Sequence, residues 1–269
     1  MSRITGKNAL ISGGASGIGK CMGNMLLEKG LQTLVIWDLD QQALDTTSAA
    51  FRGKGYQVIT CCVNIMDLAA VLSAKASLEK ENIHIDILIN NAGIIAGKYF
   101  TEHSHEDIDR TMGINSAALM HLARIFLPAM ISTGSGHIVN IASAAGLVSN
   151  PKMSVYVASK WAVIGWSESL RLEMEKLKTG VKVTTVTPYY INTGMFAGVK
   201  SPVIPILEPE TVAKRIICGI EKNKVFVRTP RIVYFLPFIK GILPRRWFDV
   251  VVGKWMGVYK TMEGFSGRK

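Results

Sequence analysis

Short apolar runs recur along the chain, and each is followed by a polar or glycine-rich segment and then by a stretch with helical periodicity. Apolar runs of this length, with no regular polar side, are typical of strands buried on both faces of a parallel sheet. We predict seven strands, at residues 8–11, 34–37, 58–63, 85–89, 137–141, 181–186 and 224–227.

Between these runs, apolar residues recur every three or four positions, which indicates helices with one apolar side. The predicted helices include residues 41–51, 66–80, 105–112, 115–130, 156–178 and 210–222, and another helix opens after the first glycine-rich segment. Alternation of strand and helix predicts a single doubly wound parallel sheet, a Rossmann fold of the α/β class with helices on both faces. We assign this domain to residues 1–230, and residues 231–269 to a basic, amphipathic C-terminal extension packed on the same domain.

Positive charge is concentrated at the C-terminal end of the chain. The net charge is +11, and residues 221–269 carry +8 of it, from eleven Lys/Arg against three acidic residues. The basic residues alternate with Ile, Val, Phe and Trp, a pattern that suits a lipid surface better than nucleic acid. We therefore expect no nucleic-acid partner.

The extension holds two apolar segments. Residues 232–243 are too short to span a bilayer, which needs about 20 apolar residues. Farther on, apolar residues at helical spacing predict one apolar helix face, made of Trp247, Phe248, Val251, Val252, Trp255, Met256 and Tyr259. Two interpretations have equal weight: the face packs on its own domain or a twin subunit, or residues 232–260 contact a membrane surface.

The cysteines and the N-terminal residues indicate the compartment. Cys21, Cys61, Cys62 and Cys218 form no CxxC pair and no Cys/His cluster with metal spacing, so we expect reduced thiols and no metal. Residues 2–7 lead directly into a strand, so we expect no signal peptide. These features favour a cytoplasmic protein, with peripheral membrane contact as its alternative placement.

A glycine-rich loop, with Gly13, Gly17 and Gly19, follows the first strand and opens a helix. Glycine lets the backbone approach a pyrophosphate closely, and the helix N-terminus favours an anion. Asp38 ends the second strand, about 20 residues farther on, where a carboxylate can bind an adenosine ribose and repel a 2′-phosphate. This favours NAD over NADP, unless Asp38 or Asp40 merely caps the helix at 41–51, which is compatible with either cofactor.

A hydroxyl, a phenol and an ammonium group follow the fifth strand. Ser143 stands just past the strand's carboxyl end, where open α/β sheets bind ligands. Tyr156 and Lys160 are four residues apart in a helical pattern and therefore share one helix face. An ammonium near a phenol lowers the phenol's pKa and makes it a usable acid/base, although this spacing alone arises by chance in many helices.

Asparagines mark two further positions. Residues 90–93 read Asn-Asn-Ala-Gly after the fourth strand, where small residues make room for a flat ligand and asparagines can satisfy turn backbone. Asn115 falls inside a helical pattern, where asparagine has a poor propensity, so we expect it to have a local hydrogen-bonding task.

Taken together, these motifs resemble the short-chain dehydrogenase/reductase family over about residues 6–230. The resemblance implies that Tyr156 is the general acid/base, Ser143 binds the substrate oxygen, Lys160 holds the nicotinamide ribose, and Asn115 supports a proton-relay water. Ile191 and Thr193 would anchor the nicotinamide carboxamide. The full implied cofactor set is Gly13, Ser16, Gly17, Ile18, Gly19, Asp38, Asn64, Asn91, Ala92, Gly93, Tyr156, Lys160, Pro188, Ile191 and Thr193.

Two positions depart from the family pattern, because Asn64 stands where an aspartate is usual and Tyr189 where a glycine is usual. The run from Pro188 through Met195-Phe196 resembles the branch of retinol dehydrogenases and 17β-hydroxysteroid dehydrogenases that act at membranes. Members of that branch commonly carry an N-terminal apolar anchor; because residues 2–7 lead directly into a strand, we do not expect integral membrane placement.

The resulting expectation is an NAD(H)-dependent alcohol dehydrogenase or ketone reductase for a bulky apolar substrate: a hydroxysteroid first, then a retinoid or long-chain lipid. The alternatives are a 3-oxoacyl-carrier-protein-type reductase, against which Asp38 argues, and a non-enzymatic lipid-surface protein, against which the intact catalytic set argues. By resemblance to the family, helices at 115–130 and 156–178 would pair subunits into a homodimer or homotetramer.

Overall fold

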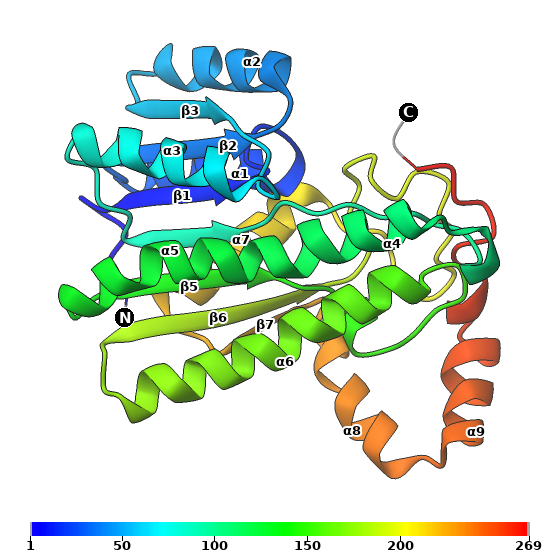
Figure 1. The fold of residues 1–269 in the computed structure, drawn as a ribbon. Helices are drawn as coiled ribbons and strands as arrows, with labels where there is room; N and C mark the ends of the chain where they lie inside the picture. Colours follow the sequence, from blue (N-terminus) through cyan, green and yellow to red (C-terminus); the bar gives the residue numbers. More distant parts are fainter. Residues whose placement is uncertain (1, 268–269) are drawn as a thin grey trace.

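Seven parallel strands form one sheet, in the order β3-β2-β1-β4-β5-β6-β7, in the computed structural model, which describes residues 2–267 (Figure 1). The prediction of seven strands is confirmed, each within two residues of its expected bounds. The strands are β1 (Asn8–Ser12), β2 (Thr33–Asp38), β3 (Val58–Cys62), β4 (Ile87–Asn90), β5 (Gly136–Ile141), β6 (Val181–Pro188) and β7 (Phe226–Thr229). Arg268 and Lys269, two of the basic residues in the predicted tail, lie outside the described residues.

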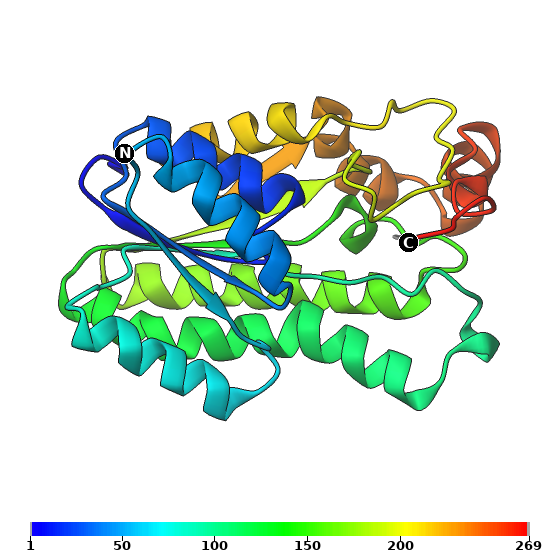
Figure 2. The same cartoon turned by 90° about the horizontal axis from the view of Figure 1, so that it is seen from above.

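Helices cover both faces of the sheet (Figure 2). One face carries α1 (Gly17–Glu28), α2 (Gln41–Arg52) and α7 (Pro209–Glu221). The other carries α3 (Leu68–Lys80), α5 (Ala118–Ser132) and α6 (Ser154–Lys176). The helix α4 (His105–Met112) continues into α5 through a π-helical turn, η2 (Gly113–Ala117), and two short 3₁₀ turns are η1 (Phe100–Glu102) and η3 (Ala144–Gly146).

Alternate residues of each strand enter two separate cores. Leu10 faces the core under α3, α5 and α6, whereas Ile11 faces the core under α1, α2 and α7. Both residues are fully buried, and their register partners repeat the division: Val35 lies beside Leu10, and Ile36 beside Ile11. Because a one-residue slip would exchange the two cores, this double burial specifies the strand register.

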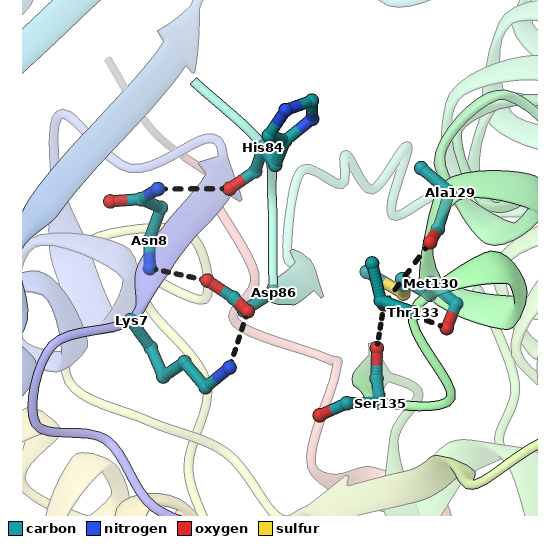
Figure 3. A network of polar contacts seen from close by, with 8 residues as sticks. All are labelled: Lys7, Asn8, His84, Asp86, Ala129, Met130, Thr133 and Ser135. Atoms are coloured by element: carbon teal, nitrogen blue, oxygen red, sulfur yellow. Dashed lines mark hydrogen bonds and ion pairs between the residues drawn. The ribbon is translucent and has the colours of Figure 1, made fainter. Parts of the chain in front are cut away.

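Polar contacts fasten the amino ends of the strands (Figure 3). The Lys7 ammonium lies 2.7 Å from Asp86 Oδ1, and the Asn8 backbone N–H donates to Asp86 Oδ2 at 2.9 Å. The Asn8 side chain donates to the His84 carbonyl at 3.0 Å, and Thr133 donates to the Ser135 carbonyl oxygen within the loop between α5 and β5. The contacts of Lys7 and Asn8 with Asp86 and His84 hold β1 beside β4 at the amino end of the sheet.

One helical run, His105–Ser132, is long and apolar enough to cross a membrane, with a mean hydropathy of 1.4 over its best window. Its Leu119, Leu122 and Phe126 side chains are buried in the protein core, and 44% of that window is covered. Core helices of globular proteins have the same composition, so the run is weak support for a membrane span.

The C-terminal extension differs from the single amphipathic helix that the spacing predicts. It contains η4 (Arg231–Tyr234), α8 (Leu236–Ile242), α9 (Arg245–Phe248), the π-helical η5 (Asp249–Trp255) and η6 (Val258–Lys260). The predicted apolar face is divided, because Phe248 and Val252 are buried whereas Trp247 and Trp255 are 64% and 78% exposed. The π-helical turn changes the number of residues per turn, and Gly257, at φ +67°, ends the helix.

Candidate active site

The glycine-rich loop is packed too tightly for side chains. Gly13 adopts φ +64°, and a Cβ there would lie 2.9 Å from the Ala92 Cα. A Cβ on Gly19 would overlap the Gly13 carbonyl oxygen. The Asn91 side chain donates to the carbonyl oxygens of Ser12, at 3.1 Å, and Gly13, at 2.8 Å, and so joins the loops after β1 and β4.

The helix α1 begins at this loop with exposed donors. Ser16 occupies the N-cap position, but its side chain makes no capping hydrogen bond, and the first turn contains no acidic residue. Backbone N–H groups of the first turn, around Gly17 and Ile18, are thus available to an anion. Thr193 faces this turn, with its Cγ2 3.3 Å from the position of a Cβ on Gly17.

Asp38 and Asp40 have different tasks. Asp40 is the N-cap of α2 and accepts a hydrogen bond from the Ala43 N–H at 3.0 Å. Asp38 accepts from Ala15 N–H at 3.0 Å and from Leu39 N–H at 2.8 Å. The capping alternative therefore applies to Asp40, whereas Asp38 is held against the glycine-rich loop at the carboxyl end of β2.

Ser143 and Lys160 meet at the end of β5. Ser143 caps η3, and its Oγ accepts a hydrogen bond from Ala145 N–H at 3.1 Å. Lys160, on α6, donates from Nζ to the Ile141 carbonyl oxygen at 2.9 Å. Its Nζ also lies 5.7 Å from the centre of the Tyr156 ring, so hydroxyl, phenol and ammonium converge within one site.

Asn115 lies at the π-helical turn η2 and is fully buried. Its side chain accepts a hydrogen bond from Ile94 N–H at 2.8 Å and donates to Ile94 O at 2.9 Å. It also donates to Ser159 Oγ at 3.1 Å, and Ser159 in turn donates to the Tyr156 carbonyl oxygen. The local hydrogen-bonding task expected for Asn115 is therefore to join the segment after β4 to the Tyr156 helix.

Burial dominates the pKa values of the two titratable groups. Desolvation raises the pKa of Tyr156 well above its ordinary value; the Ser143 hydroxyl lowers it in part and Tyr190 raises it further. Desolvation lowers the pKa of Lys160 to about 8. The expected lowering of the tyrosine's pKa by the lysine does not dominate in this structure, because both charged forms are penalised by the same apolar surroundings.

One cavity of about 260 Å³ runs along the carboxyl edge of the sheet. All of the site residues predicted above line it except Gly19 and Asn115. These two lie behind the lining and contact lining residues, Gly19 at Gly13 and Asn115 at Ile94. Asn64 lines it with its Oδ1 accepting from Met66 N–H at 3.0 Å. Met195 and Phe196, in the segment 195–207 that the sequence suggests as a loop over the site, also line it, whereas the lining residues missed from sequence include Arg110 and Ile114. Arg110 and Ile114 are four residues apart on one helical run, so the position of Asn115 was the available signal for them.

A smaller apolar cavity, of about 50 Å³, adjoins the first. Ser143, Tyr189 and Phe196 line both cavities. The Phe196 ring meets Tyr156 edge-on at 6.0 Å between centroids and Tyr190 at 5.0 Å. The C-terminal extension supplies four of the residues that line the smaller cavity: Leu236, Val252, Met256 and Val258.

The chain is similar in sequence and in fold to known proteins. The family model described as short chain dehydrogenase matches residues 7–203. The chain is 35% identical to mouse "Epidermal retinol dehydrogenase 2" over 273 residues, covering 99% of this chain and 87% of the relative. It is 34% identical to human "Estradiol 17-beta-dehydrogenase 11" over 264 residues, covering 98% and 88%.

Two solved structures are similar along nearly the whole chain. A short-chain dehydrogenase/reductase from Burkholderia phymatum in complex with NAD has a TM-score of 0.80 and 28% identity, covering 94% of this chain and 96% of that one. A short-chain dehydrogenase from Sphingobium yanoikuyae in complex with NADPH has a TM-score of 0.76 and 27% identity, covering 94% and 95%. The fold therefore occurs with either nicotinamide cofactor.

Proposed function

The chain belongs to the short-chain dehydrogenase family, and from that membership we propose that it interconverts an alcohol and a carbonyl on a bulky apolar substrate with NAD(H). The family itself makes the protein an oxidoreductase. The observation that carries the proposal is that Ser143, Tyr156 and Lys160 line the same cavity as the glycine-rich loop. A nucleotide and a substrate oxygen can therefore be held in one continuous site.

The residues of the cavity suit a dinucleotide. Gly13 lets the loop backbone pack directly against Ala92, where a Cβ would not fit, and the first turn of α1 offers N–H groups to a pyrophosphate. Asp38 would accept hydrogen bonds from the adenosine ribose, and its carboxylate would oppose a 2′-phosphate, which favours NAD. When bound, the nicotinamide supplies or accepts the hydride.

Each catalytic side chain then has one task. Ser143 would donate a hydrogen bond to the substrate oxygen, and Tyr156 would take the hydroxyl proton in oxidation or return it in reduction. Lys160 would bind the nicotinamide ribose and, with its charge, favour the phenolate form. Asn115 bonds to Ile94 and to Ser159 on the Tyr156 helix, and it would support a water that carries protons past Lys160. Orientation and fixed electrostatics supply most of the rate.

The apolar cavity supports a bulky apolar substrate. Its lining is almost entirely apolar or aromatic, and it meets the first cavity at Ser143, where the reacting oxygen would lie. A hydroxysteroid is the first candidate, followed by a retinoid and a long-chain lipid; the retinol and estradiol dehydrogenases among its relatives support that order.

Assembly and placement complete the proposal. Pairing of subunits through α5 and α6 into a homodimer or homotetramer is supported by Trp161 and Leu172, apolar side chains 45% and 55% exposed on α6. Peripheral membrane contact through residues 232–260 would bring an apolar substrate within reach, and the rest of the chain would face the cytoplasm.

Absorbance at the reduced-nicotinamide band tests the function, with purified protein, NAD⁺ or NADP⁺, and a panel of hydroxysteroids, retinol and long-chain alcohols. Turnover with NAD⁺ that disappears in Tyr156→Phe supports the proposal. Turnover with NADP⁺ alone contradicts the role of Asp38, and turnover unaffected by Tyr156→Phe contradicts the role of the tyrosine.

A further inference from the structure

The C-terminal protrusion, defined as residues 231–256, exposes large apolar side chains that nothing in the described chain covers. Figure 1 shows its helices α8 and α9 standing off the carboxyl end of the sheet, near the start of α6. The exposed apolar residues are Ile232 (40%), Tyr234 (42%), Phe235 (61%), Phe238 (67%), Ile242 (62%), Trp247 (64%) and Trp255 (78%). A cluster of this kind marks an interaction surface.

Each part of the protrusion has two opposite sides. At α8, Leu236 is buried and lines the apolar cavity, whereas Phe238 and the N-cap residue Phe235 are exposed and do not line it. On η5, Val252 is buried against the same cavity and Trp255 is exposed. One layer of helix therefore separates the apolar cavity from the exposed apolar surface.

Basic residues surround the exposed apolar side chains. The protrusion contains five Lys/Arg and one acidic residue, Asp249. Asp249 is already engaged, since Tyr259 donates to it at 2.6 Å. Arg231, Arg245, Arg246 and Lys254 are exposed. Aromatic side chains among exposed cations fit the interfacial region of a bilayer with anionic headgroups.

The fifth cation connects the protrusion to the catalytic domain. Lys240, on α8, donates to the Leu147 carbonyl oxygen at 2.8 Å, in the loop that follows Ser143. Its Nζ also lies 4.1 Å from the centre of the Trp161 ring on α6, the helix that carries Tyr156. The protrusion is therefore anchored to both elements that carry the proposed catalytic residues.

We propose that the C-terminal protrusion docks on an anionic lipid surface, with its exposed aromatic side chains among the lipid chains and its arginines at the headgroups. A second copy of the chain is the less suitable occupant, because it would bring the same excess of positive charge to the contact. The inference rests on the membrane contact of residues 232–260 in the proposed function, and it adds the charge of the lipid and the side chains that bind it.

Vesicle co-sedimentation of the full-length protein tests the inference, without substrate, on phosphatidylcholine alone and on phosphatidylcholine with phosphatidylserine. The apolar variant is Phe235→Ser/Phe238→Ser/Trp247→Ser, and the charge variant is Arg245→Gln/Arg246→Gln/Lys254→Gln. Matched controls come from exposed residues outside the protrusion and outside α5 and α6: Leu68→Ser/Leu72→Ser and Lys80→Gln/Lys182→Gln/Lys222→Gln. Thermal unfolding and NADH binding show that each variant is folded.

The wild type is expected to bind phosphatidylserine vesicles more tightly than phosphatidylcholine. The charge variant should lose on the order of a hundredfold in partitioning to the anionic vesicles, from about fivefold for each of the three cations removed. The apolar variant should lose binding to both vesicles, and the controls should behave as wild type.

Absence of wild-type binding to anionic vesicles, or variants that bind as wild type does, would overturn the inference. So would an apolar variant that changes only the oligomeric state, measured by light scattering, because its surface would then be a subunit contact. Lipid binding without any turnover would count against the proposed dehydrogenase activity alone, and turnover without lipid binding would count against the membrane contact and the docking alone.

Discussion

Asn115 and the backbone of Ile94 exchange two hydrogen bonds, at 2.8 and 2.9 Å, although 21 residues separate them. The Asn115 amide accepts from the Ile94 N–H and donates to the Ile94 carbonyl oxygen, as the backbone of a neighbouring strand would in a sheet. It supplies partners for the N–H and C=O of a half-buried residue at the wall of the cofactor cavity. The helical run tolerates this asparagine because its side chain bonds to residues distant in sequence and does not compete for the backbone groups of its own helix.

Replacement of Asn115 should therefore affect stability and catalysis together. Asn115→Ala leaves both Ile94 backbone groups without their partner, and each unsatisfied group costs about 1–3 kcal/mol. We expect a lower free energy of unfolding by about 2–4 kcal/mol, together with a reduced kcat. Urea unfolding and steady-state kinetics measure the two effects. Asn24→Ala, which removes a half-exposed asparagine on α1 that bonds to Glu28 on the surface, is the control and should change neither.

Asp38 should decide between the two nicotinamide cofactors. Asp38→Asn removes the negative charge that opposes a 2′-phosphate and keeps the shape of the side chain. We expect the ratio of kcat/KM for NAD⁺ to that for NADP⁺ to fall about tenfold or more, since 1.4 kcal/mol of lost repulsion corresponds to a factor of ten.

Asp40→Asn is the matched control for the cofactor preference. It alters the N-cap of α2, where the carboxylate accepts from Ala43 N–H, and asparagine caps a helix about as well. The NAD⁺/NADP⁺ ratio should be that of the wild type. If Asp40→Asn shifted the NAD⁺/NADP⁺ ratio as much as Asp38→Asn does, the preference would arise from the total negative charge near the carboxyl end of β2 and not from Asp38 itself.

Phe196 should limit the size of the substrate. Its ring lines both cavities and packs edge-on against Tyr156 and Tyr190. Phe196→Ala joins the two spaces, so kcat/KM for a steroid relative to a short secondary alcohol should rise on the order of tenfold. Phe100→Ala, which truncates an exposed ring away from both cavities, should leave that ratio unchanged. An equal response of both substrates would contradict the assignment.

His137 should make the protein less stable in acid. Burial lowers the pKa of this residue to about 4, from an ordinary value of 6.5, while its ring contacts Ser2 and Thr184. Between these two values the unfolded chain binds more protons than the folded chain, so the free energy of unfolding falls as pH is lowered from 6.5 towards 4.

Urea unfolding at several pH values measures this dependence. In His137→Gln the decline between pH 6.5 and 4 should be shallower than in wild type, whatever the stability at neutral pH. His121→Gln removes an exposed histidine and should keep the wild-type decline. Parallel curves for His137→Gln and wild type would show that the acid sensitivity arises elsewhere.

Local pattern determined much of this protein. Strand positions followed from apolar runs, because a strand buried on both faces excludes polar residues whatever its neighbours are. The order of the glycine loop, Ser143, Tyr156 and Lys160 along the chain was enough to predict one shared site, because parallel strands bring their carboxyl ends to a common edge.

Tertiary structure decided what depends on residues distant in sequence. It assigned the capping task to Asp40 rather than Asp38, gave Asn115 its partner at Ile94, and divided the predicted apolar face between Phe248 inside and Trp255 outside. The pKa of Lys160 also depends on the packing around it, since desolvation is a property of the surroundings. Periodicity records that a side chain is apolar, whereas only the packed fold determines which neighbour covers it or leaves it exposed.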